Sequence, residues 1–226
     1  MNNPNKAALS NGDMDFIPTF SKGIKPEVLT MIDIARGVVA GMISDKYLGR
    51  HQNHYEASLR PHVLAVAQKR GFGAFLEVRF PRDGTVKKRG AYKKLDYVLS
   101  YGRQAIAIEC KAIRPKTREL GKDGVAEDIK KLRRFPENIP QEIRASGWML
   151  IAWDNGQDNR PTKKVEVHFV KQIRNTLKLD GWTLLGDETI IKKRLRTPTL
   201  GQAILSSGHV GSYYAWCITV CVVSRF

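Results

Sequence analysis

A strongly apolar run, Ala105 to Ile108, leads directly into Glu109-Cys110-Lys111, and this transition constrains the fold more than any other feature of the sequence. Because successive side chains of a strand alternate between its two faces, Glu109 and Lys111 share one face while Cys110 points into the packing on the other. A carboxylate and an ammonium at the end of a buried strand cost free energy unless they have partners or a task. We therefore expect this strand to end at a functional edge of a sheet.

Three helices are predicted. Pro26 is typical of the first position of a helix, and an apolar stripe follows it. A second helix is expected over residues 54–70, and because it contains Pro61 it is either kinked there or begins near Arg60. A third helix, rich in lysine and arginine, is expected over residues 124–135. The helices thus precede and interrupt the strand-like part of the chain.

Strands are predicted on both sides of the third helix. Only Gly102-Arg103 separates two of them, which indicates a tight hairpin. The order helix, three strands, helix, strand is typical of a mixed sheet with helices packed on it, so we expect an α/β fold. The expected strands cover residues 74–80, 93–101, 104–112, 148–153, 165–170 and 214–223.

The length of 226 residues suits one domain with extensions. Residues 1–22 are polar and are expected to form a mobile tail, and residues 23–50 a helical N-terminal extension. The core is expected over residues 51–170. Residues 171–226, where helix and strand signals are mixed, are expected to form a C-terminal extension.

Charge predicts the class of partner. The formal net charge is +16, whereas residues 1–45 carry four Lys or Arg and five Asp or Glu, so the excess belongs to the rest of the chain. A basic excess of this size favours a polyanionic partner, because each neutralised phosphate releases counterions. We expect this partner to be DNA, with RNA as the alternative.

The compartment is predicted from the cysteines and from the first residues. Three cysteines and an opening stretch without an apolar core indicate a reducing compartment, so we expect a cytoplasmic protein. Residues 203–223 lack Asp, Glu, Lys and Arg, but His209 and several glycines and serines make them only moderately apolar. We expect a buried strand there and no contact with a membrane.

A second acid stands in the strand before Glu109. Asp96 lies among Leu95, Tyr97 and Val98, one strand upstream of Glu109-Cys110-Lys111. This spacing of acids and lysine on two successive strands resembles the PD-(D/E)xK nuclease superfamily, the restriction-endonuclease-like enzymes. The resemblance covers residues 54–154 and departs from the family pattern in having Leu95 where a proline gives the family its name. It implies a core of one helix, a three-strand meander, a further helix and a further strand.

The resemblance also implies roles for single residues. Asp96 and Glu109 would bind the metal through their carboxylates, and Cys110 through its main-chain carbonyl oxygen. Lys111 would position or activate the attacking water. The metal implied is Mg²⁺, with Mn²⁺ as a substitute, because hard cations prefer oxygen ligands. The expected activity is metal-dependent hydrolysis of phosphodiester bonds, with no small-molecule cofactor.

Three further acids compete for a place in this site. Glu56 begins the second predicted helix, where the family often supplies another acid; it is a catalytic and metal-binding candidate, or else it only complements the helix dipole. Glu77 lies within a strand and ranks below Glu56. Asp83 belongs to the turn sequence Pro-Arg-Asp-Gly, which has a local explanation, so Asp96 is preferred over it.

Basic residues near the motif are expected to contact the nucleic-acid backbone, although a solvated helix face would look the same. Lysines 93 and 94 are read as phosphate contacts or as residues that protect an edge strand. The full expected set is Lys93, Lys94, Arg114, Lys116, Lys130, Lys131, Arg133 and Arg134.

Other chemistries are disfavoured. Cys217, Cys221 and His209 provide too few ligands for zinc at unconvincing spacing, so we expect the two thiols to be buried. The sequence contains no glycine-rich phosphate loop, which disfavours ATP-driven activity. The rival functions are a nucleic-acid-binding module without catalysis and an endonuclease for structured RNA. Cleavage of both DNA strands would need a homodimer or sequential nicking, and we expect a homodimer.

Overall fold

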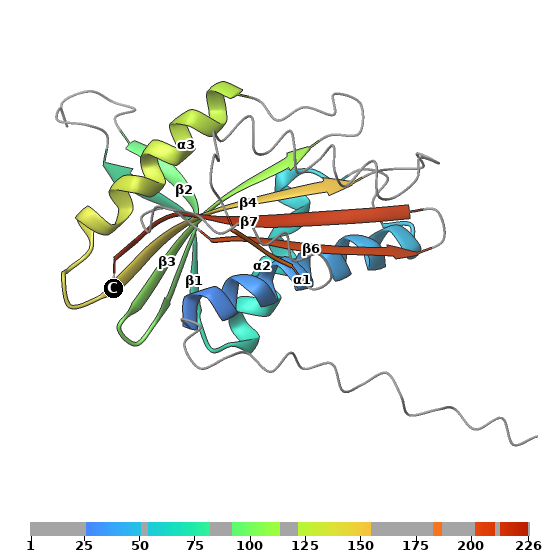
Figure 1. Ribbon diagram of the computed structural model, residues 1–226, viewed down its shortest axis with the longest axis horizontal. Helices are drawn as coiled ribbons and strands as arrows, with labels where there is room; N and C mark the ends of the chain where they lie inside the picture. The colour runs from blue at the N-terminus through green and yellow to red at the C-terminus, as the bar shows by residue number, and fades with distance from the viewer. Residues whose placement is uncertain are drawn as a thin grey trace, which may run out of the picture.

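The structure is a computed structural model that describes residues 26–50, 54–81, 92–113, 122–154, 183–186, 202–210 and 213–225. These residues form a mixed sheet with helices on both faces (Figure 1), so the predicted α/β class is confirmed. The expected tail over residues 1–22 and the expected strand over 165–170 lie outside the described residues.

The described part of the sheet has seven strands in the order β1-β2-β3-β4-β7-β6-β5. An antiparallel meander begins it, and β4 then lies parallel to β3 because a helix connects the two strands. β7 pairs antiparallel with β4, β6 antiparallel with β7, and β5 parallel with β6. The strands are β1 (Gly73–Pro81), β2 (Tyr92–Tyr101), β3 (Gln104–Ile113), β4 (Arg144–Asp154), β5 (Thr183–Gly186), β6 (Gln202–Val210) and β7 (Tyr213–Arg225).

The hairpin between β2 and β3 forms at the predicted place. Tyr101 pairs with Gln104, which leaves Gly102-Arg103 as a two-residue loop. Gly102 has a φ of +54°, a conformation that glycine adopts without steric cost. This turn sets the register that brings the end of β3 beside the beginning of β2.

Helices cover both faces of the sheet. Helices α1 (Pro26–Tyr47) and α2 (Glu56–Lys69) pack on one face, and α3 (Lys122–Arg134) crosses the other, followed by a 3₁₀ turn over Phe135–Asn138 (Figure 1). Each face has its own apolar core. On the α1 and α2 side it includes Met31, Ile34, Val38, Leu59, Leu99 and Ile108; on the α3 side, Leu95, Ala107, Val125, Leu132, Met149 and Ile151.

Helices α1 and α2 approach each other closely through glycine. A Cβ atom on Gly41 would lie 2.2 Å from Nδ1 of His62, and one on Gly37 would lie 2.4 Å from Cγ2 of Val66. The absence of side chains at these two positions, one helical turn apart, lets α2 lie directly against α1. This contact holds the beginning of α2 beside the sheet.

Helix α2 begins at Glu56, so the alternative start near Arg60 is wrong. Pro61 lies inside the helix, where it removes one N–H donor. Ser58 stabilises the first turn, since its hydroxyl accepts a hydrogen bond from the Tyr55 N–H at 2.9 Å and donates one to the Tyr55 carbonyl oxygen at 2.7 Å. The cap and the burial of Leu59 offset the missing bond of the proline.

The C-terminal part of the chain enters the sheet. β7 covers the predicted strand over 214–223 and pairs with β4 from Ala145 to Asp154, while β6 was not predicted. Arg225 closes this arrangement by donating hydrogen bonds to the carbonyl oxygens of Pro136, Ile139, Pro140 and Ile143. Among the residues that the structure describes, no helix has the length and apolar character needed to span a membrane.

Candidate active site

Four acids and two lysines from four elements meet around the end of β3. Asp96 comes from β2 and Glu109 and Lys111 from β3, as the sequence predicted. α3 adds two side chains that contact Glu109 and Lys111, and the first residue of α2 lies beside Lys111. The additions are Asp128, Lys131 and Glu56.

Asp96 fixes the junction between β2 and β3. The antiparallel pairing of these strands ends at Tyr97 and Ile108, one residue before Asp96. Beyond that pair, the Asp96 side chain replaces the backbone ladder, because its Oδ2 accepts a hydrogen bond from the Cys110 N–H at 2.7 Å. The carboxylate is therefore held across the gap between the strands, next to the Glu109 backbone.

Lys111 is held by two acids. Its Nζ lies 2.6 Å from Oδ2 of Asp128 and 3.7 Å from Oε1 of Glu56. Burial alone would lower the pKa of Lys111, but the bond to Asp128 and the negative charges of Asp128, Glu56 and Asp96 raise it above the usual 10.5. Lys111 is therefore an ammonium at neutral pH and a positive charge among these acids.

Glu109 is buried, with 1% of its surface exposed, and its Oε1 lies 2.5 Å from Nζ of Lys131. Burial raises the pKa of Glu109 to about 8, and the charges of Asp128 and Asp96 act in the same direction against the opposing effect of Lys131. A perturbed carboxyl group among like charges is typical of functional sites.

Lys131 differs from its predicted place on a basic outer face. Its Nζ also lies 2.7 Å from Oδ1 of Asp128 and donates to the carbonyl oxygen of Lys94 at 2.9 Å. Positions 125, 128 and 132 follow the helical period, so Asp128 belongs to the stripe of Val125 and Leu132 that faces the sheet. An acid on an apolar helical stripe was the sequence signal for Asp128, and Lys131 follows it at i+3.

Glu56 takes part in the site and also occupies the first turn of α2. Burial raises its pKa above the usual 4.5, the charge of Lys111 lowers it, and the charges of Asp96 and Asp128 raise it. The charges of Asp96 and Asp128 therefore raise the pKa of Glu56 as they raise that of Glu109. Its position in the first turn of α2 and 3.7 Å from Lys111 is compatible with both interpretations of Glu56, site acid and helix-dipole partner.

The remaining sequence candidates lie elsewhere. Glu77 pairs with Lys94 at 2.7 Å and Arg60 at 3.4 Å, and it has a φ of +48°, which is unusual for a residue other than glycine. Lys130 is exposed and pairs with Glu127 at 3.1 Å. Arg133 is exposed and Arg134 half-buried on the same helix. Outside the described residues lie Asp83, Arg114, Lys116 and the side chain of Lys93.

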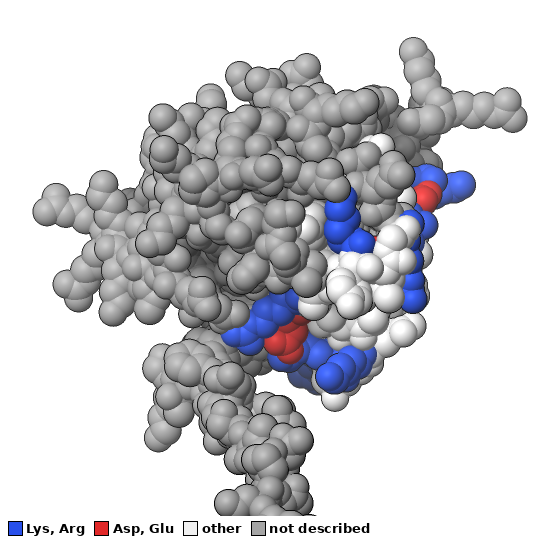
Figure 2. All heavy atoms as spheres, turned by 90° about the vertical axis from the view of Figure 1, so that its right-hand side faces the viewer, with Lys and Arg blue, Asp and Glu red and all other residues white. Residues whose placement is uncertain are grey.

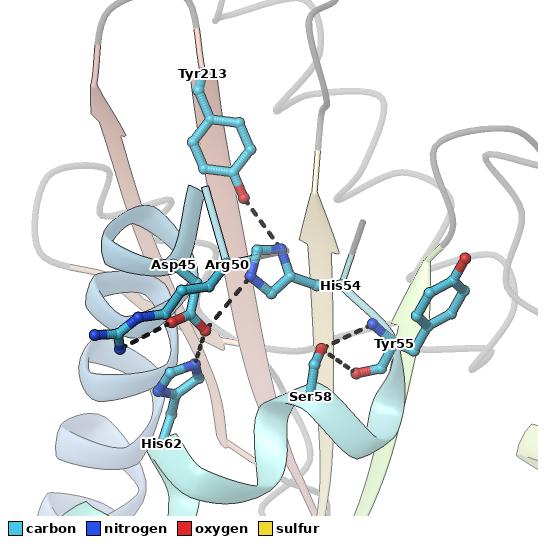
Figure 3. A network of polar contacts seen from close by, with 7 residues as sticks. All are labelled: Asp45, Arg50, His54, Tyr55, Ser58, His62 and Tyr213. Carbon is cyan, nitrogen blue, oxygen red and sulfur yellow. Dashed lines mark hydrogen bonds and ion pairs between the residues drawn. The ribbon is translucent and has the colours of Figure 1, made fainter. Parts of the chain in front are cut away.

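A second polar network, drawn in Figure 3, positions the beginning of α2. The buried Asp45 of α1 points between two histidines, with its Oδ2 at 2.9 Å from Nε2 of His62 and 3.9 Å from Nε2 of His54. The hydroxyl of Tyr213 on β7 lies 3.5 Å from Nδ1 of His54. Since His54 precedes Glu56 by two residues, this network ties the Glu56 segment to α1 and to the C-terminal strand.

The site residues fit a divalent cation in type and charge. The four acids provide oxygen donors, which suit a hard ion, and once Glu109 is ionised their four negative charges exceed the two positive charges of the lysines. In the described part of the chain, however, no group of three or more His, Cys, Asp or Glu is arranged to hold an ion. Cys217 and Cys221 are buried thiols, as expected, and burial raises the pKa of Cys217.

Charged side chains lie around the described surface on one side of the molecule. On the side of the molecule shown in Figure 2, lysine and arginine side chains border the described surface, and acidic side chains in view lie beside them.

In comparisons with known proteins, no family model, no curated protein and no solved structure matches this chain.

Proposed function

We propose that this protein is a metal-dependent endonuclease of the PD-(D/E)xK type that hydrolyses DNA phosphodiester bonds. One observation carries the proposal: Asp96, Glu109 and Lys111 meet at one strand end, joined there by Glu56. The order of α2, the β1–β3 meander, α3 and β4 supports a restriction-endonuclease-like core. The net charge of +16 supports a nucleic-acid substrate.

Each site residue has a role in this proposal. Asp96 and Glu109, with the Cys110 carbonyl oxygen and Glu56, are the groups that would hold Mg²⁺ or Mn²⁺. When bound, the metal ion would polarise the phosphate and lower the pKa of a bound water. Lys111 remains protonated, so its ammonium stabilises the negative charge that develops on the phosphate and on the attacking oxygen.

Asp128 positions Lys111. Its Oδ2 holds the Lys111 ammonium at 2.6 Å, and its Oδ1 holds Lys131 at 2.7 Å. Because Asp128 lies on a helix that packs against the sheet, it holds the Lys111 ammonium in one place beside the end of β3. A rigidly placed charge contributes more to catalysis than a mobile one, since less reorganisation accompanies the reaction.

Nicking of supercoiled plasmid tests the proposal. Wild type is expected to nick with Mg²⁺ and not with EDTA, while Lys111→Met and Glu109→Gln lose the activity by about 10²-fold or more. Lys69→Met, at an exposed position on α2, removes one charge outside the site and is the matched control. Equal metal-dependent nicking by wild type and both site variants would refute the assignment of Lys111 and Glu109 to the active site.

The partner and the assembly need separate measurements. Matched duplexes of DNA and RNA distinguish a deoxyribonuclease from a ribonuclease, and duplex binding by wild type without cleavage in Mg²⁺ would favour the non-catalytic module. A homodimer is proposed for double-strand cleavage; α1, which the sequence suggested as a dimer surface, is mostly buried against the sheet. Light scattering of the DNA-free and DNA-bound protein measures the assembly directly.

A further inference from the structure

We propose that Lys131 is an internal counter-cation of the metal site: in the metal-free protein its ammonium occupies Oε1 of Glu109, and a divalent ion must displace it to bind there. This inference rests on the proposed function and concerns how the same site is regulated. It explains why suitable acids converge without forming a ready metal cage among the described residues.

The contacts of Lys131 support this role. Its ammonium lies against Oε1 of the buried Glu109 and Oδ1 of Asp128, and only 12% of its side chain is exposed. A divalent ion bound to Glu109 would therefore approach a buried positive charge in direct contact with the ligand oxygen. Like charges at such separations repel strongly where water is excluded, so the two cations compete for this oxygen.

Lys131 can leave Glu109 without losing every partner. Asp128 and the carbonyl oxygen of Lys94 also bind its ammonium, at 2.7 and 2.9 Å. These two groups are not among the proposed metal ligands, so they remain to hold the lysine after an ion has taken Glu109. A short movement of one flexible side chain is enough, and the backbone of α3 need not move.

Asp128 connects Lys131 with Lys111. The two lysines share Asp128, each on a different carboxylate oxygen. When Lys131 leaves Glu109, its ammonium still has Asp128 and the carbonyl oxygen of Lys94 as partners. The same lysine therefore lowers the affinity of the empty site for metal and stays within the site, bound to Asp128, once the metal has bound.

Calorimetric titration of the DNA-free protein with Mg²⁺ and with Mn²⁺, at one pH and ionic strength, tests the inference. Lys131→Met keeps the length of the side chain and removes its charge, so the dissociation constant is expected to fall by about tenfold or more. Lys130→Met is the matched control, because this exposed neighbour pairs with Glu127 and its loss changes the net charge equally. Its metal affinity should stay within about twofold of wild type.

An unchanged or larger dissociation constant for Lys131→Met would overturn the inference. If that variant fails to fold by circular dichroism, Lys131→Gln, which keeps an N–H donor for Asp128, decides by the same criterion. Plasmid nicking by wild type separates this inference from the proposed function. Nicking with an unchanged metal affinity in the variants refutes only the counter-cation, whereas tighter metal binding in the variants without nicking by wild type refutes only the nuclease.

Discussion

Replacing Glu109 by glutamine should stabilise the metal-free protein in alkaline solution. Burial raises the pKa of Glu109 from its usual 4.5 to about 8, so the folded protein keeps a proton that the unfolded chain releases between these pH values. The stability from this proton is complete below about pH 4.5 and is lost as the pH rises through about 8. Glutamine does not titrate and keeps an oxygen acceptor for Lys131.

The size of the effect follows from the pKa. A difference of one pKa unit corresponds to about 1.4 kcal/mol. Charging Glu109 in the folded protein therefore costs on the order of 4 kcal/mol, with no large reduction by solvent because the side chain is almost fully buried. The gain in unfolding free energy of Glu109→Gln over wild type should grow by this amount between about pH 5 and pH 9.

Urea unfolding in EDTA at several pH values measures this difference. EDTA is required because a bound divalent ion would stabilise ionised Glu109. Glu142→Gln, at an exposed position before β4, is the control and should follow the wild-type curve. Parallel pH dependence of wild type and Glu109→Gln would refute the reasoning, because it would mean that Glu109 ionises as easily in the folded protein as in the unfolded chain.

Three other outcomes are expected. Gly41→Ala should lower the unfolding free energy by about 1–3 kcal/mol in thermal or urea unfolding, because its Cβ would overlap His62, whereas Gly124→Ala, with open space around it, should not. Mg²⁺ binding should release protons between about pH 5 and 8, because the metal requires ionised Glu109; equal calorimetric heats in buffers of different ionisation enthalpy would contradict this. Arg225→Ala should lower the melting temperature, as it removes four hydrogen bonds to carbonyl oxygens; an unchanged value would show that β7 is held by its pairing alone.

Local patterns were sufficient for the β1–β3 meander of the sheet. Alternating and apolar runs placed β2 and β3, and the two-residue link at Gly102-Arg103 set their register. That register alone brings Asp96 beside Glu109 and Lys111, because antiparallel pairing fixes which residues face each other. Strand and turn signals act over a few residues, so they can be read from a single segment of the chain.

Long-range pairing was beyond such patterns. β6 was not predicted, and β7 was expected as a strand but not as the partner of β4. The pairing of strands from distant segments depends on the shape and burial of the whole sheet, which no short window contains. The same limit applies to the Asp45 network, where α1, α2 and β7 each contribute one or two side chains.

The sequence by itself determined the chemistry at the end of β3: two acids and a lysine on adjacent strands, in an α/β protein with a large positive charge. Only the tertiary structure decided how these charges are balanced. Asp128 and Lys131 come from α3, which follows β3 in the chain, and their contacts with Lys111 and Glu109 form only in the folded protein. Burial then raises the pKa of the Glu109 carboxyl group, so that it keeps its proton. Ionisation and ion pairing depend on desolvation and on distances across space, and these quantities exist only once the chain is packed.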